Sequence, residues 1–259
     1  MNASIKREKI YWNRHFHEEL LRMKKSGEIF SQYYWMQYHQ DLAGAIKDKS
    51  KSHKNRTVLE LGCGSGKASL LTNLEASYYL VDIAENALQT AEYLSEILGI
   101  KKIKTFRRDV FNNKLSPNFF DIVVSIGLIE HYTSPEIIKL CAEINRVIKD
   151  QGTIFLGIPN YRSLAYQKAN FLKRLDKKFI ISKIIPGYRN HSEKPYSESD
   201  MRKIFRLSKL NLIETEYVGP WLFVETPKFI IKLSRSFGID NYFYKNNFLT
   251  LYILEKGHR

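Results

Sequence analysis

Apolar positions follow two different spacings along the chain. Near its start they recur at helical spacing, as Trp12, Phe16 and Leu20 illustrate, which predicts that residues 5–48 are helical. Residues 49–56 are polar and charged and are predicted to be a linker. From residue 57 onward, short apolar runs alternate with helical segments. This alternation favours a parallel sheet that is covered by helices on both faces.

The predicted strands are short, and helices or loops separate them. The strands are Thr57–Leu61, Tyr78–Val81, Ile103–Arg107, Phe120–Ile126, Thr153–Ile158, Leu210–Val218 and Leu249–Leu254. Helices are predicted at Lys67–Leu74, Glu85–Leu98, Pro135–Ile148 and Glu198–Ser208, the last with Ser197 as its N-cap. We therefore expect an α/β protein.

Two segments after Pro159 interrupt this alternation. Residues 161–185 have the pattern of one basic amphipathic helix, with Leu164 and Phe171 among its apolar positions. Residues 219–247, rich in Trp, Phe and Tyr, are predicted to be a long loop before the last strand. Long loops in compact domains are commonly functional or mobile.

The composition indicates the class of protein and its cellular environment. The 44 % hydrophobic and 26 % charged residues are typical of a globular chain, and no apolar run reaches the ~20 residues that span a bilayer. The N-terminal segment has no apolar stretch after its charges, so no secretory signal is expected. Cys63 and Cys141 form no C-x-x-C pair, which excludes a disulfide scaffold or a zinc ribbon. We expect a cytoplasmic protein, and no metal ligands are predicted.

The net charge of +14 is unevenly distributed. Residues 1–56 and 159–195 are strongly basic, whereas residues 57–158 are nearly neutral. Basic flanks attract acidic partners, such as phosphorylated small molecules, nucleic acid or an anionic membrane. A lysine-rich surface without any partner explains the same charge equally well.

A glycine cluster, Gly62-Cys63-Gly64-Ser65-Gly66, follows the first predicted strand and precedes a helix. Glycines at such a place allow a tight turn and a close approach to a ligand. The cluster is not a P-loop, because Leu61 stands where that motif needs its first glycine and Ala68 follows Lys67. A dinucleotide fingerprint is disfavoured, because the bulky Lys67 occupies the position of its third small residue.

The pattern Glu60-x-Gly62-x-Gly64-x-Gly66 resembles motif I of the class I S-adenosylmethionine-dependent methyltransferases. The resemblance continues in order over residues 57–158, through Asp82 and Asp109 to residues 121–131. The chain is similar to the branch that includes ubiquinone-pathway, sugar and natural-product methyltransferases. The resemblance implies a Rossmann-like, seven-stranded, mostly parallel sheet, S-adenosyl-L-methionine as cofactor and S-adenosyl-L-homocysteine as product.

The resemblance also implies roles for residues at the strand ends. Asp82 would accept hydrogen bonds from the ribose hydroxyls, a task that suits a carboxylate because it only accepts. Asp109 would meet the adenine amino group, and Val110 would line the adenine ring. The implied cofactor-binding residues are Glu60, Gly62, Cys63, Gly64, Gly66, Asp82, Ile83, Asp109, Val110, Ile126 and Gly127.

Several of these and other residues have a structural alternative. Glu60 can serve as an acid that organises the loop, Cys63 as a small filler between glycines, and Asp121 as an acid that orients loops before a buried strand. For the aromatic residues a role in core packing is favoured over a role in covering ligands. These residues are Tyr33, Tyr34, Trp35, Tyr38, Trp221 and Phe223.

With this resemblance, the chain divides into four parts. Residues 1–56 are predicted to form a helical cap and residues 57–158 the cofactor-binding core. Residues 159–195 would be a basic helical insertion that acts as a lid. Residues 196–259 would complete the core sheet and carry the aromatic insertion 219–247.

Methyl transfer is an in-line displacement in which the cofactor supplies an electrophilic methyl group and the protein aligns the reactants. Orientation can contribute ~7–11 kcal/mol, against about 3–5 kcal/mol from a general base. His131 is the candidate base, since it follows the fourth strand at the ligand-binding edge and an ordinary histidine pKa, about 6.5, suits proton removal from a hydroxyl. A purely structural role for His131 is weighed slightly higher. His191, Tyr188 and Tyr196 are weaker candidates.

The favoured acceptor is a hydroxyl of a small molecule, and an amine is less favoured. Anionic and lipid-linked molecules are among the acceptors considered. The basic helix 161–185 raises a second hypothesis, a lipid-linked acceptor with peripheral contact to an anionic membrane. RNA binding or RNA methylation is a third. Nucleic acid is disfavoured because Cys141 lies among apolar residues, where it is a poor nucleophile, and no Asn-Pro-Pro-Tyr sequence follows the fourth strand. No oligomeric state is predicted.

Overall fold

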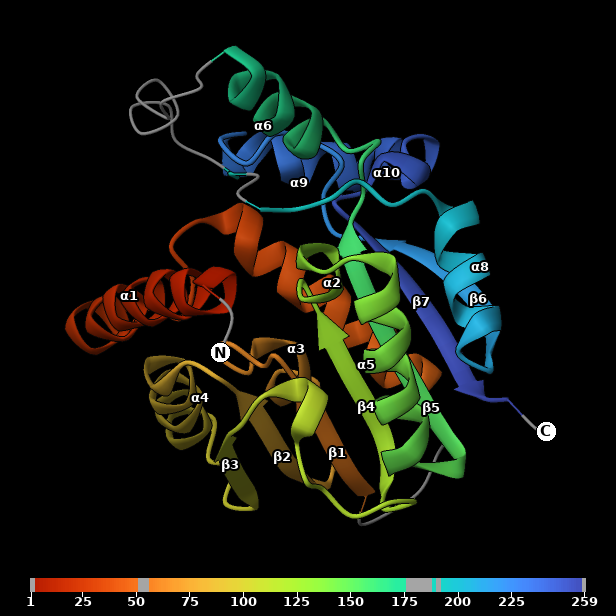
Figure 1. Cartoon of the computed structure of the whole chain (residues 1–259). Helices are drawn as coiled ribbons and strands as arrows, with labels where there is room; N and C mark the ends of the chain where they lie inside the picture. Colours follow the sequence, from red (N-terminus) through yellow and green to blue (C-terminus); the bar gives the residue numbers. More distant parts are fainter. Residues whose placement is uncertain (1–2, 51–55, 176–187, 190–191, 258–259) are drawn as a thin grey trace.

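Seven strands form one sheet at the centre of the molecule (Figure 1). The computed structural model describes residues 3–50, 56–175, 188–189 and 192–257. The strands are β1 Arg56–Leu61, β2 Ala76–Asp82, β3 Ile103–Arg107, β4 Phe120–Ile126, β5 Ile148–Pro159, β6 Leu210–Val218 and β7 Leu249–Lys256. Their order is β3-β2-β1-β4-β5-β7-β6, with β1 to β5 parallel and β7 antiparallel to both of its neighbours. The predicted seven-stranded, mostly parallel, Rossmann-like sheet is confirmed.

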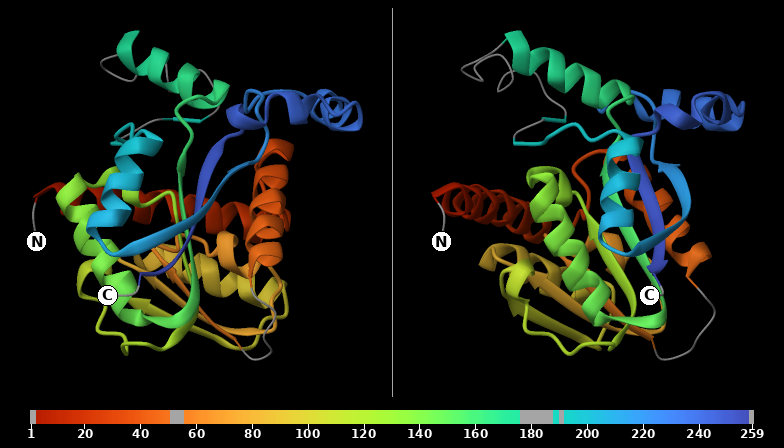
Figure 2. Two further views of the ribbon diagram at one scale, coloured as in Figure 1. Left: turned by 90° about the vertical axis from the view of Figure 1, so that its right-hand side faces the viewer. Right: turned by 45° about the vertical axis from the view of Figure 1, so that its right-hand side comes forward.

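Helices cover both faces of this sheet, as the two views of Figure 2 show. The helices are α1 Ala3–Ser26, α2 Tyr33–Lys49, α3 Lys67–Leu70, α4 Glu85–Ile97, α5 Ser134–Val147, α6 Leu164–Leu175, α8 Glu198–Leu207, α9 Lys228–Ser236 and α10 Ile239–Tyr242, with short turns η1 Val110–Asn112, η2 Ile129–His131 and η3 Tyr244–Asn246. One hydrophobic core contains Leu42 of α2 and Leu94 of α4. The other contains Ile144 of α5 and Phe205 of α8. The sheet is therefore buried on both sides, as its continuous apolar strands require.

Capping boxes mark the starts of α5 and α8. Thr133 and Glu136 form the box at α5, and Ser197 and Asp200 form the box at α8. Each box satisfies backbone N–H groups that the first turn of a helix leaves unpaired. The predicted cap at Ser197 is confirmed.

Two elements of the core have bounds that differ from the prediction. Helix α3 ends at Leu70 instead of Leu74, because the chain turns at Asn73, whose backbone φ is +48°. Strand β5 begins at Ile148, before the predicted start at Thr153. Ile148 pairs with Phe120 across a bulge in the β4–β5 ladder, so the turn before β5 is part of the strand.

The basic helix predicted over residues 161–185 begins later, at Leu164. The buried Asn160 holds the preceding residues in a turn. Its Oδ1 accepts the N–H of Arg162 at 3.0 Å, and its Nδ2 donates to the carbonyl of Asn247 at 2.8 Å. Residues 176–185 of the predicted helix, like residues 51–55 of the predicted linker, lie outside the described residues.

The prediction of a long loop over residues 219–247 is wrong, because this segment folds into α9, α10 and η3. Trp221 is at the centre of this unit. Its ring stacks on Phe243 with 4.1 Å between centroids, and its Nε1 donates to Asp240 Oδ1 at 3.0 Å. The favoured packing role of Trp221 is confirmed.

The helical region predicted over residues 5–48 consists of two helices that pack on the core differently. Helix α2 buries side chains such as Ile46 against the sheet. Helix α1 crosses the edge where the parallel strands end and lies on α4 (Figure 1), where Asn13 and Asn86 exchange hydrogen bonds of 3.0 and 2.9 Å. Among the helices described, none combines the length and the hydropathy needed to cross a bilayer.

Candidate active site

The glycine turn, residues 62–66 between β1 and α3, contains three left-handed glycines. Gly62, Gly64 and Gly66 have φ angles of +64°, +51° and +71°. Gly62 donates its N–H to the Val81 carbonyl at 2.9 Å, which ties the turn to the end of β2. A Cβ atom on Gly62 would lie 2.7 Å from the side chain of Leu128, beyond β4. The left-handed backbone therefore favours glycine at this position, and a Cβ atom would also force the Leu128 side chain to move.

Asp82 at the end of β2 lies against the same turn. One of its carboxylate oxygens accepts the N–H of Gly64 at 2.9 Å, and the other accepts the N–H of Ala84 at 2.8 Å. Burial raises the pKa of Asp82, and these backbone donors oppose the rise. Each oxygen keeps a second lone pair, so the carboxylate can accept further donors from a ligand on the turn. Ile83, next in the chain, is half-buried.

Glu60 in β1 makes the contact expected of an acid that organises the loop. Its buried Oε2 accepts both the N–H and the hydroxyl of Ser69 in α3. Burial raises the pKa of Glu60 to about 8, although the bonds from Ser69 act in the opposite direction. Cys63 is also buried, in the turn itself, where a small side chain fits.

Helix α1 closes the outer side of the glycine turn. The ring of Phe16 is so close to Gly64 that a Cβ atom there would lie 2.6 Å from Phe16 Cζ. Lys67, the first residue of α3, forms a largely buried ion pair with Glu19 of α1. Sequence reasoning assigned neither Phe16 nor Glu19 to the site, because helical spacing indicates packing but does not say against what.

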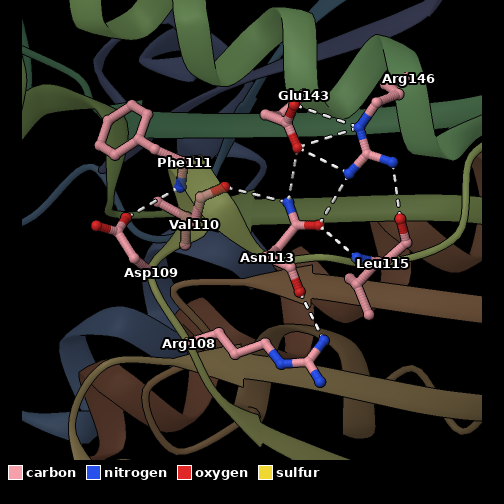
Figure 3. A network of polar contacts seen from close by, with 8 residues as sticks. All are labelled: Arg108, Asp109, Val110, Phe111, Asn113, Leu115, Glu143 and Arg146. Carbon is pink, nitrogen blue, oxygen red and sulfur yellow. Dashed lines mark hydrogen bonds and ion pairs between the residues drawn. The ribbon is translucent and has the colours of Figure 1, made fainter.

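The loop after β3 is held by the fully buried side chain of Asn113 (Figure 3). Its Nδ2 donates to the Val110 carbonyl at 3.1 Å and to Glu143 at 3.3 Å, while its Oδ1 accepts from Arg146 at 3.2 Å. One oxygen of the exposed Asp109 accepts the N–H two residues later at 3.0 Å, and the other contacts none of the residues drawn in Figure 3. The network therefore fixes Asp109 and the buried Val110 at the edge where the strands end. Asn113 was not predicted, since a lone Asn in a loop gives no signal of burial.

Strand β4 ends at the half-buried Ile126 and at Gly127, whose φ is +73°. The chain then enters η2, which places His131 in a half-buried position. The His131 Nδ1 atom lies 2.7 Å from the Ser192 hydroxyl, and its ring is 5.9 Å from the ring of Trp12 on α1. Because Trp12 also lies 5.9 Å from the ring of Phe16, α1 links the glycine turn to His131.

Two carboxyl groups lie beside His131. Glu130, His131 and Glu193 each place one side-chain atom within 4.8 Å of the others. Glu130 is buried, its Oε2 has no hydrogen-bond partner among the described residues, and burial raises its pKa well above the ordinary value. Burial likewise raises the pKa of Glu193 to about 7, against a hydrogen bond from Tyr188. A positive charge that forms at His131 would be stabilised by both carboxyl groups.

Sequence reasoning missed the two carboxyl groups for different reasons. Glu130 directly follows the apolar residues 126–129, and a charged residue at the end of such a run could have indicated a functional carboxyl group. Glu193 belongs to a polar segment in which no spacing singles it out. Tyr188, a weaker candidate, joins this cluster through Glu193, whereas His191 lies outside the described residues.

The aromatic residues of α2 mostly pack in the core. Tyr34 and Tyr38 are buried there, and Tyr33 and Trp35 are partly buried against it, which confirms the favoured interpretation. Tyr196 donates its hydroxyl to a backbone carbonyl at 2.7 Å, ahead of α5.

Asp121 and Cys141 lie away from the glycine turn. Asp121 pairs with Lys149 at 2.7 Å and accepts the N–H of Thr57 at 2.9 Å, which confirms its structural role. It lines a hollow of about 490 Å³ at the amino ends of the strands, opposite the edge that carries the turn. Burial raises the pKa of Cys141 to about 12, so that this thiol is the poor nucleophile that was predicted.

Comparison with known proteins identifies the class of this domain. Residues 58–152 match the family model described as methyltransferase domain. The chain is similar to magnesium protoporphyrin IX methyltransferase from Synechocystis PCC 6803 with bound SAH, with a TM-score of 0.65 and 16 % identity over 98 % of this chain and 100 % of that one. It is also similar to an S-adenosylmethionine-dependent methyltransferase from Clostridium acetobutylicum ATCC 824, with a TM-score of 0.56 and 14 % identity over 95 % of this chain and 98 % of that one. No curated protein sequence matches the chain.

The similar structures establish the fold, and the family match identifies residues 58–152 as a methyltransferase domain. The [4+2]-cyclase SpnF shares the fold, with a TM-score of 0.61 and 12 % identity over 89 % of this chain and 85 % of that one, so the fold alone does not determine an activity. Residues 58–152 are a methyltransferase domain, and the sheet that contains them has the fold of the similar methyltransferase structures. The chain therefore contains a methyltransferase domain, whose cofactor is S-adenosylmethionine and whose reaction requires an acceptor for the methyl group.

Proposed function

We propose that this enzyme transfers the methyl group to a hydroxyl of a small-molecule acceptor. The observation that carries the proposal is the placement of His131 beside Glu130 and Glu193, with α1 connecting it to the glycine turn. Proton removal from a hydroxyl leaves a positive charge on the imidazole, and the neighbouring carboxyl groups stabilise that charge. An uncharged amine is already nucleophilic and has less need of such a group.

The residues at the strand ends fit the cofactor. The lone pairs that Asp82 keeps beside its bonds from Gly64 and Ala84 would accept the ribose hydroxyls. The outward oxygen of Asp109 would meet the adenine amino group, and Val110 would line the adenine ring. The bound cofactor supplies the electrophilic methyl group. Cys63, Ile83, Ile126 and Gly127 are proposed as further contacts, and Glu60 would act through the loop that it holds.

His131 would take the proton of the acceptor as the methyl group moves. The Ser192 hydroxyl at Nδ1 and the ring of Trp12 hold the imidazole in place. Burial raises the pKa of Glu130, and an imidazolium beside it would favour the ionised form of this carboxyl group. A base of this kind contributes ~10²–10⁴-fold to the rate, which is less than orientation of the reactants supplies.

A screen of acceptors that measures formation of S-adenosylhomocysteine tests the proposal. It compares phenols and sugars with amines of the same carbon skeleton, and we expect turnover of hydroxyl acceptors. With the best acceptor, His131→Ala should lower kcat by as much as ~10⁴-fold while the affinity for S-adenosylhomocysteine stays unchanged.

The control variant is His17→Ala, on the exposed side of α1, which should keep full activity. Turnover restricted to amines would contradict the hydroxyl assignment. Full activity of His131→Ala on a hydroxyl acceptor would remove His131 from the mechanism and leave the class of the enzyme untouched.

A further inference from the structure

Large apolar side chains are exposed on α6, α9 and α10 at one end of the molecule. Six of them are between 53 % and 93 % exposed. They are Phe171 and Leu175 of α6, Phe229 and Leu233 of α9, Phe237 directly after α9, and Tyr242 of α10. We call these six side chains the apolar end. Single exposed apolar residues are ordinary on a protein surface, but a group of this size marks an interaction site.

Helix α9 presents its apolar stripe outward. Phe229, Leu233 and Phe237 follow one another at intervals of four residues and are all exposed, whereas Ile231 packs in the core. The exposed Lys232 flanks the stripe. A helix that only packs on its own domain turns its apolar stripe inward, so the arrangement of α9 indicates a second apolar environment outside the chain.

Helix α6 repeats this arrangement. Ala165, Tyr166 and Ala169 are buried, while Phe171 and Leu175, four residues apart, are exposed. An ion pair of 2.6 Å between Lys168 of α6 and Glu225 connects α6 to the segment ahead of α9. Figures 1 and 2 show α6, α9 and α10 at the same end of the molecule, beyond the carboxyl ends of the parallel strands.

The segments that form the apolar end are basic. Residues 159–175 and 219–247 contain eight Lys and Arg and two acidic residues, and both acids, Glu225 and Asp240, are in ion pairs with residues of the same segments. Their charge is thus complementary to an anionic surface. Helix α9 is also bound to α2, because Arg235 donates to the Asp41 carboxylate through both of its terminal nitrogens.

We infer that the apolar end, with its basic surroundings, docks on the surface of an anionic phospholipid bilayer. Helices that lie in a membrane interface combine Phe, Leu and Tyr on one side with Lys and Arg around them, as α6 and α9 do. Aromatic side chains are favoured at the depth of the headgroups, and each basic residue near an anionic leaflet adds attraction. The surface inserts side chains into the interface and needs no spanning helix.

Docking would hold the enzyme in one orientation. Helix α9 is fixed to α2, and Figure 1 shows α6, α9 and α10 beyond the carboxyl ends of the strands, so the edge with the glycine turn lies toward the same end of the molecule as the apolar end. This inference does not depend on the acceptor or on His131, and vesicle binding can be measured without methyl transfer.

Sedimentation of the full chain with vesicles tests the inference. The vesicles are pure phosphatidylcholine or phosphatidylcholine mixed with phosphatidylglycerol. We expect binding to the anionic vesicles that weakens with salt. The combined variant Phe229→Ser, Leu233→Ser and Phe237→Ser should lower the partition coefficient by at least ~10-fold, and Phe171→Ser with Leu175→Ser should lower it independently.

The control variant carries the same kind of change elsewhere: Ile97→Ser, Leu207→Ser and Ile213→Ser, three exposed positions outside the apolar end. It should bind vesicles as the unchanged chain does. Lys232→Gln with Arg174→Gln should weaken binding to anionic vesicles by several-fold and leave binding to phosphatidylcholine unaltered.

Three outcomes would overturn the inference. The first is that the unchanged chain fails to bind anionic vesicles. The second is that the control variant and the combined variant of Phe229, Leu233 and Phe237 lose vesicle binding equally. The third is that the Phe229 variant abolishes self-association of the chain in solution without altering vesicle binding, which would assign the surface to a second copy.

Discussion

Replacing Gly64 by alanine should loosen the contact between the glycine turn and α1. The change has two costs, which the structure separates. The first is the left-handed backbone at φ +51°, which costs a residue with a Cβ atom about 1–2 kcal/mol. Alanine also stiffens the unfolded chain, which offsets about 0.4–1 kcal/mol of this cost. The second is the approach of the new Cβ to 2.6 Å from Phe16 Cζ, an overpacking worth about 1–3 kcal/mol.

A matched control isolates the first cost. Gly99 also has a positive φ, +68°, but a Cβ atom there would meet nothing within 4 Å among the described residues. Gly99→Ala should therefore lower the free energy of unfolding by only about 0–1.5 kcal/mol, against about 1–4 kcal/mol for Gly64→Ala. Urea unfolding of both variants measures the difference.

A double-mutant cycle with Phe16→Ala identifies the source of the second cost. Removing the ring makes room for the Cβ atom that Gly64→Ala introduces. The loss in free energy of unfolding of the double variant should therefore be smaller than the sum of the two single losses by about 1–3 kcal/mol. The same cycle with Gly99→Ala should be additive within about 0.5 kcal/mol. Additivity in both cycles would show that Phe16 does not lie on the turn and would refute the placement of α1 over the site.

Two further predictions concern buried polar groups. Asn113→Ala should lower the free energy of unfolding by about 1–3 kcal/mol, because the carbonyl of the buried Val110 loses its donor and the loop loses its bonds to Glu143 and Arg146. A loss below about 0.5 kcal/mol in urea unfolding would contradict the network. The pKa of Glu60 is about 8 in the folded chain and has its ordinary value, 4.5, in the unfolded chain. Between these two pH values the folded chain keeps a proton on Glu60 that the unfolded chain has released. The free energy of unfolding therefore falls as pH rises through this window, by up to about 1.4 kcal/mol per pH unit. Glu60→Gln should flatten this decline, and an unchanged pH profile would show that Glu60 is not buried as a neutral acid.

The strands and the glycine turn could be predicted because their signals are local. Alternating apolar runs mark the strands, and Asp82 stands at the end of such a run, so topology alone brings it to the turn. The helices of residues 219–247 were not predicted, although Phe229, Leu233 and Phe237 recur at helical spacing. Helix α9 has only nine residues, which is shorter than the window over which such spacing identifies a helix.

The contacts that complete the site join residues far apart in the sequence, so no local pattern predicts them. Phe16 reaches Gly64 across more than forty residues of sequence, and Glu193 reaches His131 from a polar segment. The sequence indicated that α1 has an apolar side, but the partner of that side depends on how the chain crosses the strand ends. Glu60 shows the opposite case, since the structural alternative proposed from its position agrees with its bonds to Ser69.

In the proposed site, the glycine turn and Asp82 hold the adenosyl cofactor. Calorimetry with S-adenosylhomocysteine tests this placement most directly, on the unchanged chain, on Asp82→Asn and on the control Asp121→Asn at the opposite edge of the sheet. We expect the unchanged chain and Asp121→Asn to bind equally, whereas Asp82→Asn should bind at least ~10-fold more weakly because it loses charge-assisted bonds to the ribose. Equal affinity of all three proteins would contradict this placement.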